Sequence, residues 1–310
     1  MAEEVWMLQT KKADFKQIGA RFRIDPVTAR IIRNRGIEGE AAIDRYLNGT
    51  LDDLYDPMLL KDMECAVSIL CEAVDTGKKI RIVGDYDIDG VCSTYILLQA
   101  FERLGSDVDF EIPDRIKDGY GINESIIEQA HADGVEVILT CDNGISAFHQ
   151  VELAKKYGMT VVITDHHEVP LDGEKEKIPP ADAVIDPKQA DCPYPFPEIC
   201  GAVVAYKLVQ VLYARRGVPQ MEWLDLLEFA AIATVGDVMK LQDENRILVK
   251  YGLKKMAQTK NLGLRRLAEK NNLDLGAITA YHIGFVIGPC LNAGGRLKTA
   301  KEALALLRAQ

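Results

Sequence analysis

The sequence lacks any long uninterrupted apolar run. No stretch approaches the roughly 20 consecutive apolar residues that a membrane-spanning helix requires. The first residues, Met1-Ala2-Glu3-Glu4, also lack the basic and apolar regions of a secretory signal peptide. We therefore expect a protein of the cytoplasm that does not associate with a membrane. We also expect a monomer.

Paired cysteines are also missing. The chain has seven cysteines, an odd number, and none of them form a C-x-x-C motif. This pattern disfavours a disulfide framework or a cysteine-based metal site and favours reduced thiols in the core. The positions are 65, 71, 92, 141, 192, 200 and 290.

Positive charge is scarce overall, and the net charge is −10. Evenly spread, this charge would argue against binding to nucleic acid. Residues 246–310, however, hold twelve Lys or Arg and three acidic residues, a balance of +9, which leaves −19 for residues 1–245. The asymmetry suggests an acidic, metal-binding part joined to a part that could hold an anionic polymer. A solvated basic helix face is the alternative interpretation.

What the sequence does contain is ample apolar material, 48 % of residues, in two kinds of pattern. Helical apolar spacing at 27–36, 40–47 and 58–74 predicts a helical segment over residues 1–75. From Lys79, short apolar runs alternate with helical stretches, which predicts a mostly parallel, Rossmann-like α/β sheet with helices on both faces over residues 76–240. Residues 241–310 form a basic helical segment in this scheme. The expected strands are 80–83, 108–112, 135–140, 160–164 and 183–185, and helices should begin near Val91, Asn123, Ser146 and Gly201.

The first predicted strand of the sheet runs directly into an acidic loop. Asp85, Asp87 and Asp89 follow the run Ile80–Val83, and Gly90 closes the segment. The carboxyl ends of strands are where open α/β sheets place ligands. Carboxylates this close repel one another, and a divalent cation relieves that repulsion. A solvated Asp-rich turn remains the alternative for this segment alone.

Three further acidic segments could contribute ligands to the same metal site. Asp142 precedes an Asn-Gly turn after the third strand, and Asp165-His166-His167 follows the fourth. Imidazole together with carboxylates suits Mn, Zn or Fe better than Mg alone. Asp237 lies in the apolar run 231–239, where it could be hydrogen-bonded in the core, cap a turn or ligate a metal. Because the other acidic segments also suit a metal ion, we favour the interpretation of Asp237 as a metal ligand.

These motifs, in this order and approximate spacing, resemble those of the DHH phosphoesterases. The closer resemblance is to the RecJ family of bacterial single-strand-specific DNA exonucleases, and it extends over roughly residues 45–300. It includes the segments 51–63 (LDDLYDPMLLKDM), 113–121 (PDRIKDGYG), 237–248 and 288–297 (GPCLNAGGRL).

The resemblance implies removal of nucleotides from single-stranded DNA in the 5′-to-3′ direction with two divalent metal ions, Mn²⁺ or Mg²⁺, in DNA repair and recombination. Asp87 and Asp142 would hold the first ion, and Asp142 would bridge to the second. The second ion would be held by Asp89, Asp142, His166 and Asp237. The implied catalytic residues are Asp85, His167 and Arg296. The implied nucleic-acid contacts are Arg115, Tyr120, Asn292, Gly295 and Arg296.

Two features depart from the family pattern. Many DHH relatives have a histidine four residues before the second aspartate of the first motif, where this chain has Val83. The first ion is therefore expected to bind more weakly or to use Asp85 or water. The family also continues beyond the equivalent of Gln310 into further domains, so we expect the C-terminal domains to be absent from this chain and strand grip to suffer.

Two other functions stay open on the sequence. A DHH phosphodiesterase could act on short oligonucleotides, cyclic dinucleotides or pyrophosphate, although the basic C-terminal segment favours a polymer. A non-catalytic nucleic-acid-binding or scaffold protein is the other option. The clustered carboxylates argue against it, because repulsion among them serves no purpose in a scaffold. A single-strand-binding protein or a helicase is the expected protein partner of the exonuclease.

Overall fold

A computed structural model describes residues 11–114, 119, 121–297 and 299–309. The chain divides into two compact units, residues 1–54 and 55–310, which we describe separately. The sequence-based boundaries at residues 75 and 240 stay predictions. No helix among the described residues is long and apolar enough to cross a membrane.

The first unit is built from short helices, of which the first two begin at side-chain caps. Asp14 accepts a hydrogen bond from the backbone N–H of Gln17 at the start of its helix, and Asp25 does the same from Val27 and Thr28. Such caps satisfy amides that the first helical turn leaves unpaired. The predicted helices at 27–36 and 40–47 are present. The elements are α1 (Phe15–Phe22), α2 (Pro26–Asn34), α3 (Glu40–Asn48) and the 3₁₀ turn η1 (Leu51–Asp53).

The second unit contains a five-stranded sheet in which every pair is parallel, with the strand order β2-β1-β3-β4-β7. All five strands were predicted from the apolar runs, within two residues at each end. The runs are nearly continuous because parallel strands are covered on both faces. The strands are β1 (Ile80–Val83), β2 (Val108–Glu111), β3 (Val137–Cys141), β4 (Thr160–Thr164) and β7 (Ala183–Ile185).

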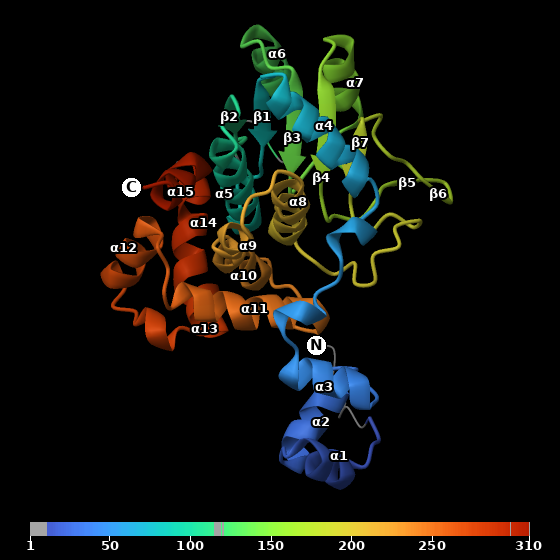
Figure 1. The fold of residues 1–310 in the computed structure, drawn as a ribbon, viewed down its shortest axis with the longest axis vertical. Coiled ribbons are helices and arrows are strands. Elements are labelled where there is room, and N and C mark those ends of the chain that lie inside the picture. Colours follow the sequence, from blue (N-terminus) through green and yellow to red (C-terminus); the bar gives the residue numbers. More distant parts are fainter. Residues whose placement is uncertain (1–10, 115–118, 120, 298, 310) are drawn as a thin grey trace, which may run out of the picture. The chain divides into compact units, whose positions relative to one another are not determined.

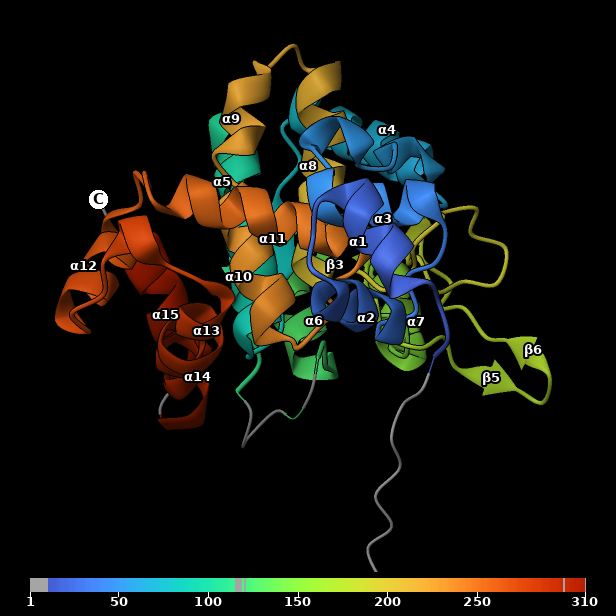
Figure 2. The same cartoon turned by 90° about the horizontal axis from the view of Figure 1, so that it is seen from below.

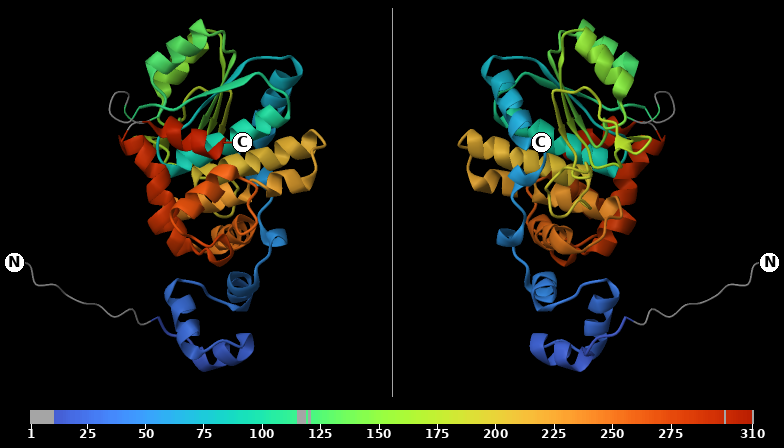
Figure 3. Two further views of the ribbon diagram at one scale, coloured as in Figure 1. Left: turned by 90° about the vertical axis from the view of Figure 1, so that its left-hand side faces the viewer. Right: turned by 90° about the vertical axis from the view of Figure 1, so that its right-hand side faces the viewer.

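Helices cover both faces of this sheet, as predicted (Figure 3). One face carries α6 (Glu124–Ala132) and α7 (Phe148–Lys156), which pack on a buried apolar cluster that includes Val83, Ile138 and Ile163. The other face carries α4 (Met63–Asp75), α5 (Ile88–Arg103) and α8 (Gly201–Arg215).

Arg81 is the one charged residue in β1, and it is buried. Its guanidinium donates to Asp109 at 2.7 and 2.8 Å and to Asp133 at 2.8 Å. A buried charge is tolerated when it is paired and hydrogen-bonded in this way. Arg81 thus interrupts the apolar run without disrupting the strand.

The strand order creates a crevice at the acidic loop. From β1 the chain crosses to β2 on one side, and it then returns to place β3 on the other side of β1. Neighbouring strands whose connections leave in opposite directions open a crevice at their carboxyl ends, where doubly wound folds bind ligands. The segments that follow β1 and β3 therefore face each other.

The C-terminal helices lie beyond the carboxyl ends of the strands (Figure 1), and the β5–β6 hairpin lies on the other side of this unit from α12 and α15 (Figure 2). The hairpin is β5 (Leu171–Asp172) and β6 (Lys175–Glu176), and a 3₁₀ turn η2 (Pro57–Leu59) precedes α4. The helices are α9 (Gln220–Leu224), α10 (Leu227–Gly236), α11 (Asp243–Met256), α12 (Leu262–Lys270), η3 (Leu275–Ala277), α13 (Ala280–His282), the π-helix η4 (Ile283–Ile287), α14 (Gly288–Leu297) and α15 (Ala300–Leu307).

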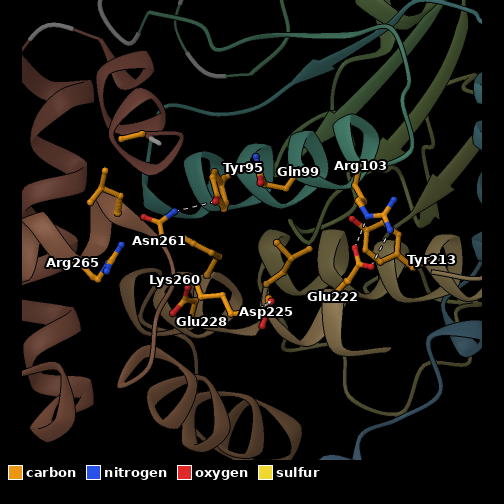
Figure 4. A pocket seen from close by; sticks show the side chains of 14 residues that line it. Tyr95, Gln99, Arg103, Tyr213, Glu222, Asp225, Glu228, Lys260, Asn261 and Arg265 are labelled. Atoms are coloured by element: carbon orange, nitrogen blue, oxygen red, sulfur yellow. Dashed lines mark hydrogen bonds and ion pairs between the residues drawn. The ribbon is translucent and has the colours of Figure 1, made fainter. Parts of the chain in front are cut away.

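A cavity of about 490 Å³ lies among α5, α9, α10 and α12, away from the crevice (Figure 4). Its charged side chains are largely paired with each other, Arg103 with Glu222 and Lys260 with Asp225. Glu228 lines it and is buried; its Oε1 accepts from Thr259 Oγ1 at 2.7 Å. Burial raises the pKa of Glu228 to about 7.

The raised pKa of Glu228 predicts a stability that depends on pH. Because the folded chain holds this proton up to about pH 7 and the unfolded chain releases it near pH 4.5, stability falls as the pH rises through that window. Glu228→Gln should remove the loss and be more stable than the parent at pH 8 by about 3 kcal/mol. Thermal unfolding at pH 5 and pH 8 measures the difference. An advantage equal at both pH values would contradict the assignment.

Candidate active site

The acidic loop after β1 is a tight turn into α5. Asp87 caps the helix, since its Oδ1 accepts from the backbone N–H of Asp89 at 2.9 Å and of Gly90 at 3.0 Å. A Cβ on Gly90 would lie only 2.4 Å from the carbonyl oxygen of Asp85, so the turn can close this tightly only with glycine. The loop thereby holds Asp85, Asp87 and Asp89 within one turn of chain.

Asp142 follows β3 in a left-handed backbone conformation, φ 60°. This conformation is unusual for a residue other than glycine, although Asp and Asn adopt it more readily than most. Asn143 fixes it to the neighbouring strand, donating to the carbonyl oxygens of Val83 at 3.0 Å and Cys141 at 2.9 Å. The ends of β1 and β3 are thus tied together by one amide, which sets the spacing between the loop and Asp142.

The segment after β4 separates its two histidines. His166 is buried, and its Nε2 lies 3.0 Å from Asp142 Oδ1. His167 is half-exposed, and its Nδ1 lies 2.7 Å from Asp165 Oδ1. Asp165 is itself buried and accepts from the backbone N–H of Ile145 at 2.9 Å. Asp165 therefore orients the His167 ring, whereas His166 points into the carboxylate cluster.

Asp89 and Asp237 complete the cluster from two helices. Asp89 is fully buried and accepts from the N–H groups of Gly201 and Ala202 at 2.7 Å each, at the amino end of α8, where the helix dipole favours a negative charge. Asp237 ends α10. His166 Nε2 is 3.3 Å from Asp89 Oδ2 and 3.9 Å from Asp237 Oδ2.

Three overlapping groups of potential metal ligands result; one joins Asp142, His166 and His167, and the other two hold the remaining carboxylates. In the first of these two, Asp85, Asp87 and Asp142 offer carboxylate oxygen atoms within 4.8 Å of one another. In the second, two carboxylate oxygen atoms of Asp89 and Asp237 and a ring nitrogen of His166 lie equally close. Asp142 and His166, which lie side by side, connect these two groups. The five predicted metal ligands thus lie together, and Asp85 joins them as a further oxygen donor.

The carboxylates of the cluster repel one another. Burial, followed by the neighbouring carboxylates, raises the pKa of Asp85 and of Asp237 to about 7. The same causes raise the pKa of Asp87 and hold that of Asp142 well above its usual range. Burial lowers the pKa of His166, which favours the neutral, ligating form of the ring. Carboxylate oxygens and a neutral imidazole in this state fit divalent cations such as Mn²⁺.

The pKa of His167 shifts in the opposite direction from that of His166. Burial acts to lower the pKa of His167, but the hydrogen bond and the charge of Asp165 outweigh it and raise the pKa to about 9. In return, although burial acts to raise the pKa of Asp165, the bond with His167 leaves it below the usual range. The two form a charge pair beside the cluster, in which Asp165 is buried and His167 is half-exposed.

For the other predicted site residues, the structure describes only some side chains. Arg115, Tyr120 and the side chain of Arg296 lie outside the described residues. Asn292 and Gly295 lie on α14. A Cβ on Gly295 would lie 2.5 Å from the carbonyl oxygen of Tyr86, so this glycine lets α14 pack on the acidic loop. Close packing is thus one reason for this glycine, and a nucleic-acid contact by Gly295 stays a prediction.

Sequence reasoning missed three supporting residues. Asp165 was noted only as part of its motif, and Asn143 only as a turn residue. Asp186 was not noted, although it follows the predicted strand 183–185 at the same edge of the sheet. It is fully buried, and burial followed by Asp165 raises its pKa to about 7. The position after each predicted strand was the signal that could have found it.

The fold and the cluster together define a metal-binding protein of the doubly wound α/β class. Residues 79–234 match the N-terminal domain of the DHH family. The chain belongs to the DHH family, which confirms the resemblance seen in the motifs.

Curated relatives refine this placement. The chain is 37 % identical over 306 residues to the single-stranded-DNA-specific exonuclease RecJ of Bacillus subtilis, covering 98 % of this chain and 38 % of that protein. It is 36 % identical over 295 residues to the protein of the same name in Escherichia coli, covering 92 % and 50 %. The chain thus spans half or less of the length of these two relatives.

Solved structures agree with this placement. RecJ from Thermus thermophilus in complex with Mn²⁺ matches with a TM-score of 0.78 and 31 % identity, over 96 % of this chain and 41 % of that one. An exonuclease RecJ bound to manganese matches with a TM-score of 0.70 and 35 % identity, over 80 % and 61 %. The predicted fold class is confirmed, and both of these relatives were solved with manganese.

Repulsion within the cluster predicts opposite effects of Asp142→Asn with and without metal. Asparagine keeps the shape and tolerates the left-handed backbone, but it removes one buried charge. In EDTA the variant should unfold at a higher temperature than the parent, by a few degrees for about 1 kcal/mol. In Mn²⁺ the parent should gain stability and the variant should not. Thermal unfolding in both buffers checks this, and a variant that Mn²⁺ stabilises as fully as the parent would remove Asp142 from the ligand set.

Gly201 allows α8 to approach Asp142, since an added Cβ would lie 2.7 Å from the Asp142 Cβ and 2.9 Å from its Oδ1. Gly201→Ala should displace the carboxylate without removing any ligand and weaken Mn²⁺ binding by about tenfold, as supporting residues of metal sites do. Calorimetric titration measures the affinity. Gly284→Ala is the matched control, because its Cβ would meet its nearest neighbour at an ordinary 3.8 Å. Equal affinities for the two variants would contradict the argument.

Proposed function

We propose that this chain is a metal-dependent exonuclease that removes nucleotides from single-stranded DNA in the 5′-to-3′ direction. The observation that carries the proposal is the meeting of two ligand groups at Asp142 and His166, at the carboxyl edge of the sheet. The similarity to proteins named single-stranded-DNA-specific exonucleases supports the substrate class.

The proposed ligands of the first cation are Asp87 and Asp142, with Asp85 beside them. The proposed ligands of the second are Asp89, Asp142, His166 and Asp237. Two divalent cations held in this way would supply charge stabilisation for an in-line displacement at phosphorus. Since Asp142 is common to both sets, it fixes their relative position.

His167 is the proposed contact to the phosphate or the leaving group. Asp165 holds its Nδ1 at 2.7 Å, so the opposite edge of the ring is turned away from this carboxylate. The fixed ring can donate a hydrogen bond without first losing side-chain entropy.

The remaining proposed site residues would contact the DNA strand away from the cations. Arg296 and Arg115 would neutralise phosphoryl oxygens by paired N–H donors, with Tyr120, Asn292 and Gly295 beside the backbone. Recruitment by a single-strand-binding protein or a helicase, a monomeric state, a role in DNA repair and a place in the cytoplasm stay predictions from the sequence.

Digestion of end-labelled DNA tests the proposal directly. We expect this chain to release a 5′ label as mononucleotide from single-stranded DNA, with Mn²⁺ or Mg²⁺ but not with EDTA, and to leave duplex DNA intact. Early release of a 3′ label would reverse the proposed polarity. Hydrolysis of dinucleotides alone would move the chain to the phosphodiesterases of short substrates, and no hydrolysis with retained strand binding would make it a binding protein.

Asp142→Ala is the matching loss-of-function variant. Removing the shared ligand should lower turnover by about a thousandfold or more, since both cations contribute several kcal/mol to the transition state. Asp172→Ala, at an exposed position in β5, serves as the control. Near-normal turnover by Asp142→Ala would show that the two-metal arrangement is wrong.

A further inference from the structure

Two aromatic side chains stand out on the surface of the C-terminal helices. Tyr281 is 64 % exposed and Phe285 is 70 % exposed, the highest values for aromatic residues in the described part of the chain. Their rings stack on each other, with centroids 4.8 Å apart and planes 28° from parallel. We call Tyr281 and Phe285 the aromatic pair.

The aromatic pair lies on the outer side of its helix. Ile283 and Ile287, which alternate with it, are buried. The outer side of such a helix is normally polar, because exposing apolar surface to water is unfavourable. The turn around Phe285 is also a π-helix, a rare conformation that occurs frequently at functional sites.

The helical stretch that carries the aromatic pair borders the proposed active site. At its start, a Cβ on Gly284 would touch Val235, two residues before Asp237, at 3.8 Å. Further along, a Cβ on Gly288 would lie 3.4 Å from Ile88, which separates Asp87 from Asp89. At its end, Gly295 packs on the carbonyl oxygen of Tyr86. The same stretch also carries Asn292, one of the predicted nucleic-acid contacts.

Charge indicates what could cover the rings. The aromatic pair belongs to residues 246–310, which carry a balance of +9, whereas the rest of the chain carries −19. Surfaces that bind single strands combine positive charge, which follows the phosphates, with exposed rings on which bases stack. Along the sequence, the Lys or Arg residues nearest to the aromatic pair are Lys270 before it and Arg296 after it.

We infer that the aromatic pair is a stacking platform for nucleobases of single-stranded DNA on the outer side of the helical stretch that borders the active site. This inference rests on the proposed function and adds a determinant for unpaired bases to it. In a duplex the bases are stacked on one another and their faces are closed to the rings. The platform therefore favours a single strand and tolerates any sequence, because every base has an aromatic face.

The test compares removal of the rings with removal of the bases. Binding of labelled oligothymidylate and of an abasic strand of equal length is measured by fluorescence anisotropy in EDTA. Tyr281→Ala/Phe285→Ala should bind oligothymidylate about tenfold to a hundredfold more weakly and the abasic strand nearly as well as the parent does. Equal losses for both strands, or no loss for either, would overturn the inference.

Controls separate stacking from charge and from misfolding. Tyr157→Ala removes an exposed ring from the opposite edge of the sheet, next to the start of β4, and should change neither affinity. Tyr281→Trp/Phe285→Trp should restore binding to oligothymidylate. The slope of log affinity against log salt should stay the same in all these variants, because no phosphate contact is lost. A changed slope would assign the effect to charge and overturn the inference.

The two proposals fail in different ways. If the parent chain neither binds nor degrades oligothymidylate, the proposed function fails and the platform fails with it. If the parent degrades the strand with metal present and Tyr281→Ala/Phe285→Ala keeps the same KM, only the platform fails. A change in sedimentation coefficient with unaltered DNA binding would assign the aromatic pair to a protein interface and overturn the inference.

Discussion

Repulsion among buried carboxylates is the constraint on which the rest of the active-site region depends. Asp85, Asp87, Asp142 and Asp237 have raised pKa values because burial and their neighbours oppose the charged form. A chain left to itself would relax this strain by separating the groups. The sheet prevents this, since Asn143 ties the ends of β1 and β3 together and α8 holds Asp89 with two backbone amides. The strain is thus maintained by backbone contacts, and cations relieve it when bound.

The same contacts explain why small residues surround the cluster. Gly90 closes the acidic loop on Asp85, and Gly201 admits α8 to within contact of Asp142. A methyl group added at either glycine would force the neighbouring backbone apart, and this shift would move a carboxylate of the cluster. The left-handed backbone of Asp142 belongs to this set, because strained conformations persist only where the surroundings determine them fully. Precision at the cluster therefore comes from close packing of backbone on backbone.

Much of this arrangement could be predicted from local sequence. Strands buried on both faces leave continuous apolar runs, and the residue after each run marks one edge of the sheet, which located Asp85, Asp87, Asp89, Asp142 and His166. Other features depend on packing that no local pattern encodes. Asp237 ends a helix buried among other helices, so its apolar surroundings alone could not separate a ligand from a core aspartate. The exposure of Tyr281 and Phe285 was not predicted, because residues 281, 283, 285 and 287 are all apolar and the sequence does not show which of them face the core.

The division of charge along the chain follows from the chemistry of the cluster. A site made of carboxylates repels a polyanion, and residues 1–245 together carry −19. Bound cations would make the charge of the site positive only in their immediate surroundings. Attraction over the length of a strand must come from elsewhere, and residues 246–310 supply +9 on helices of which α14 packs against the acidic loop itself. Since screening in physiological salt allows charges to act over about 8 Å, the basic segment must adjoin the cluster to offset it. The contact between Gly295 and the loop provides that proximity for α14, so the helix that carries Gly295 is packed directly on the segment that holds the carboxylates.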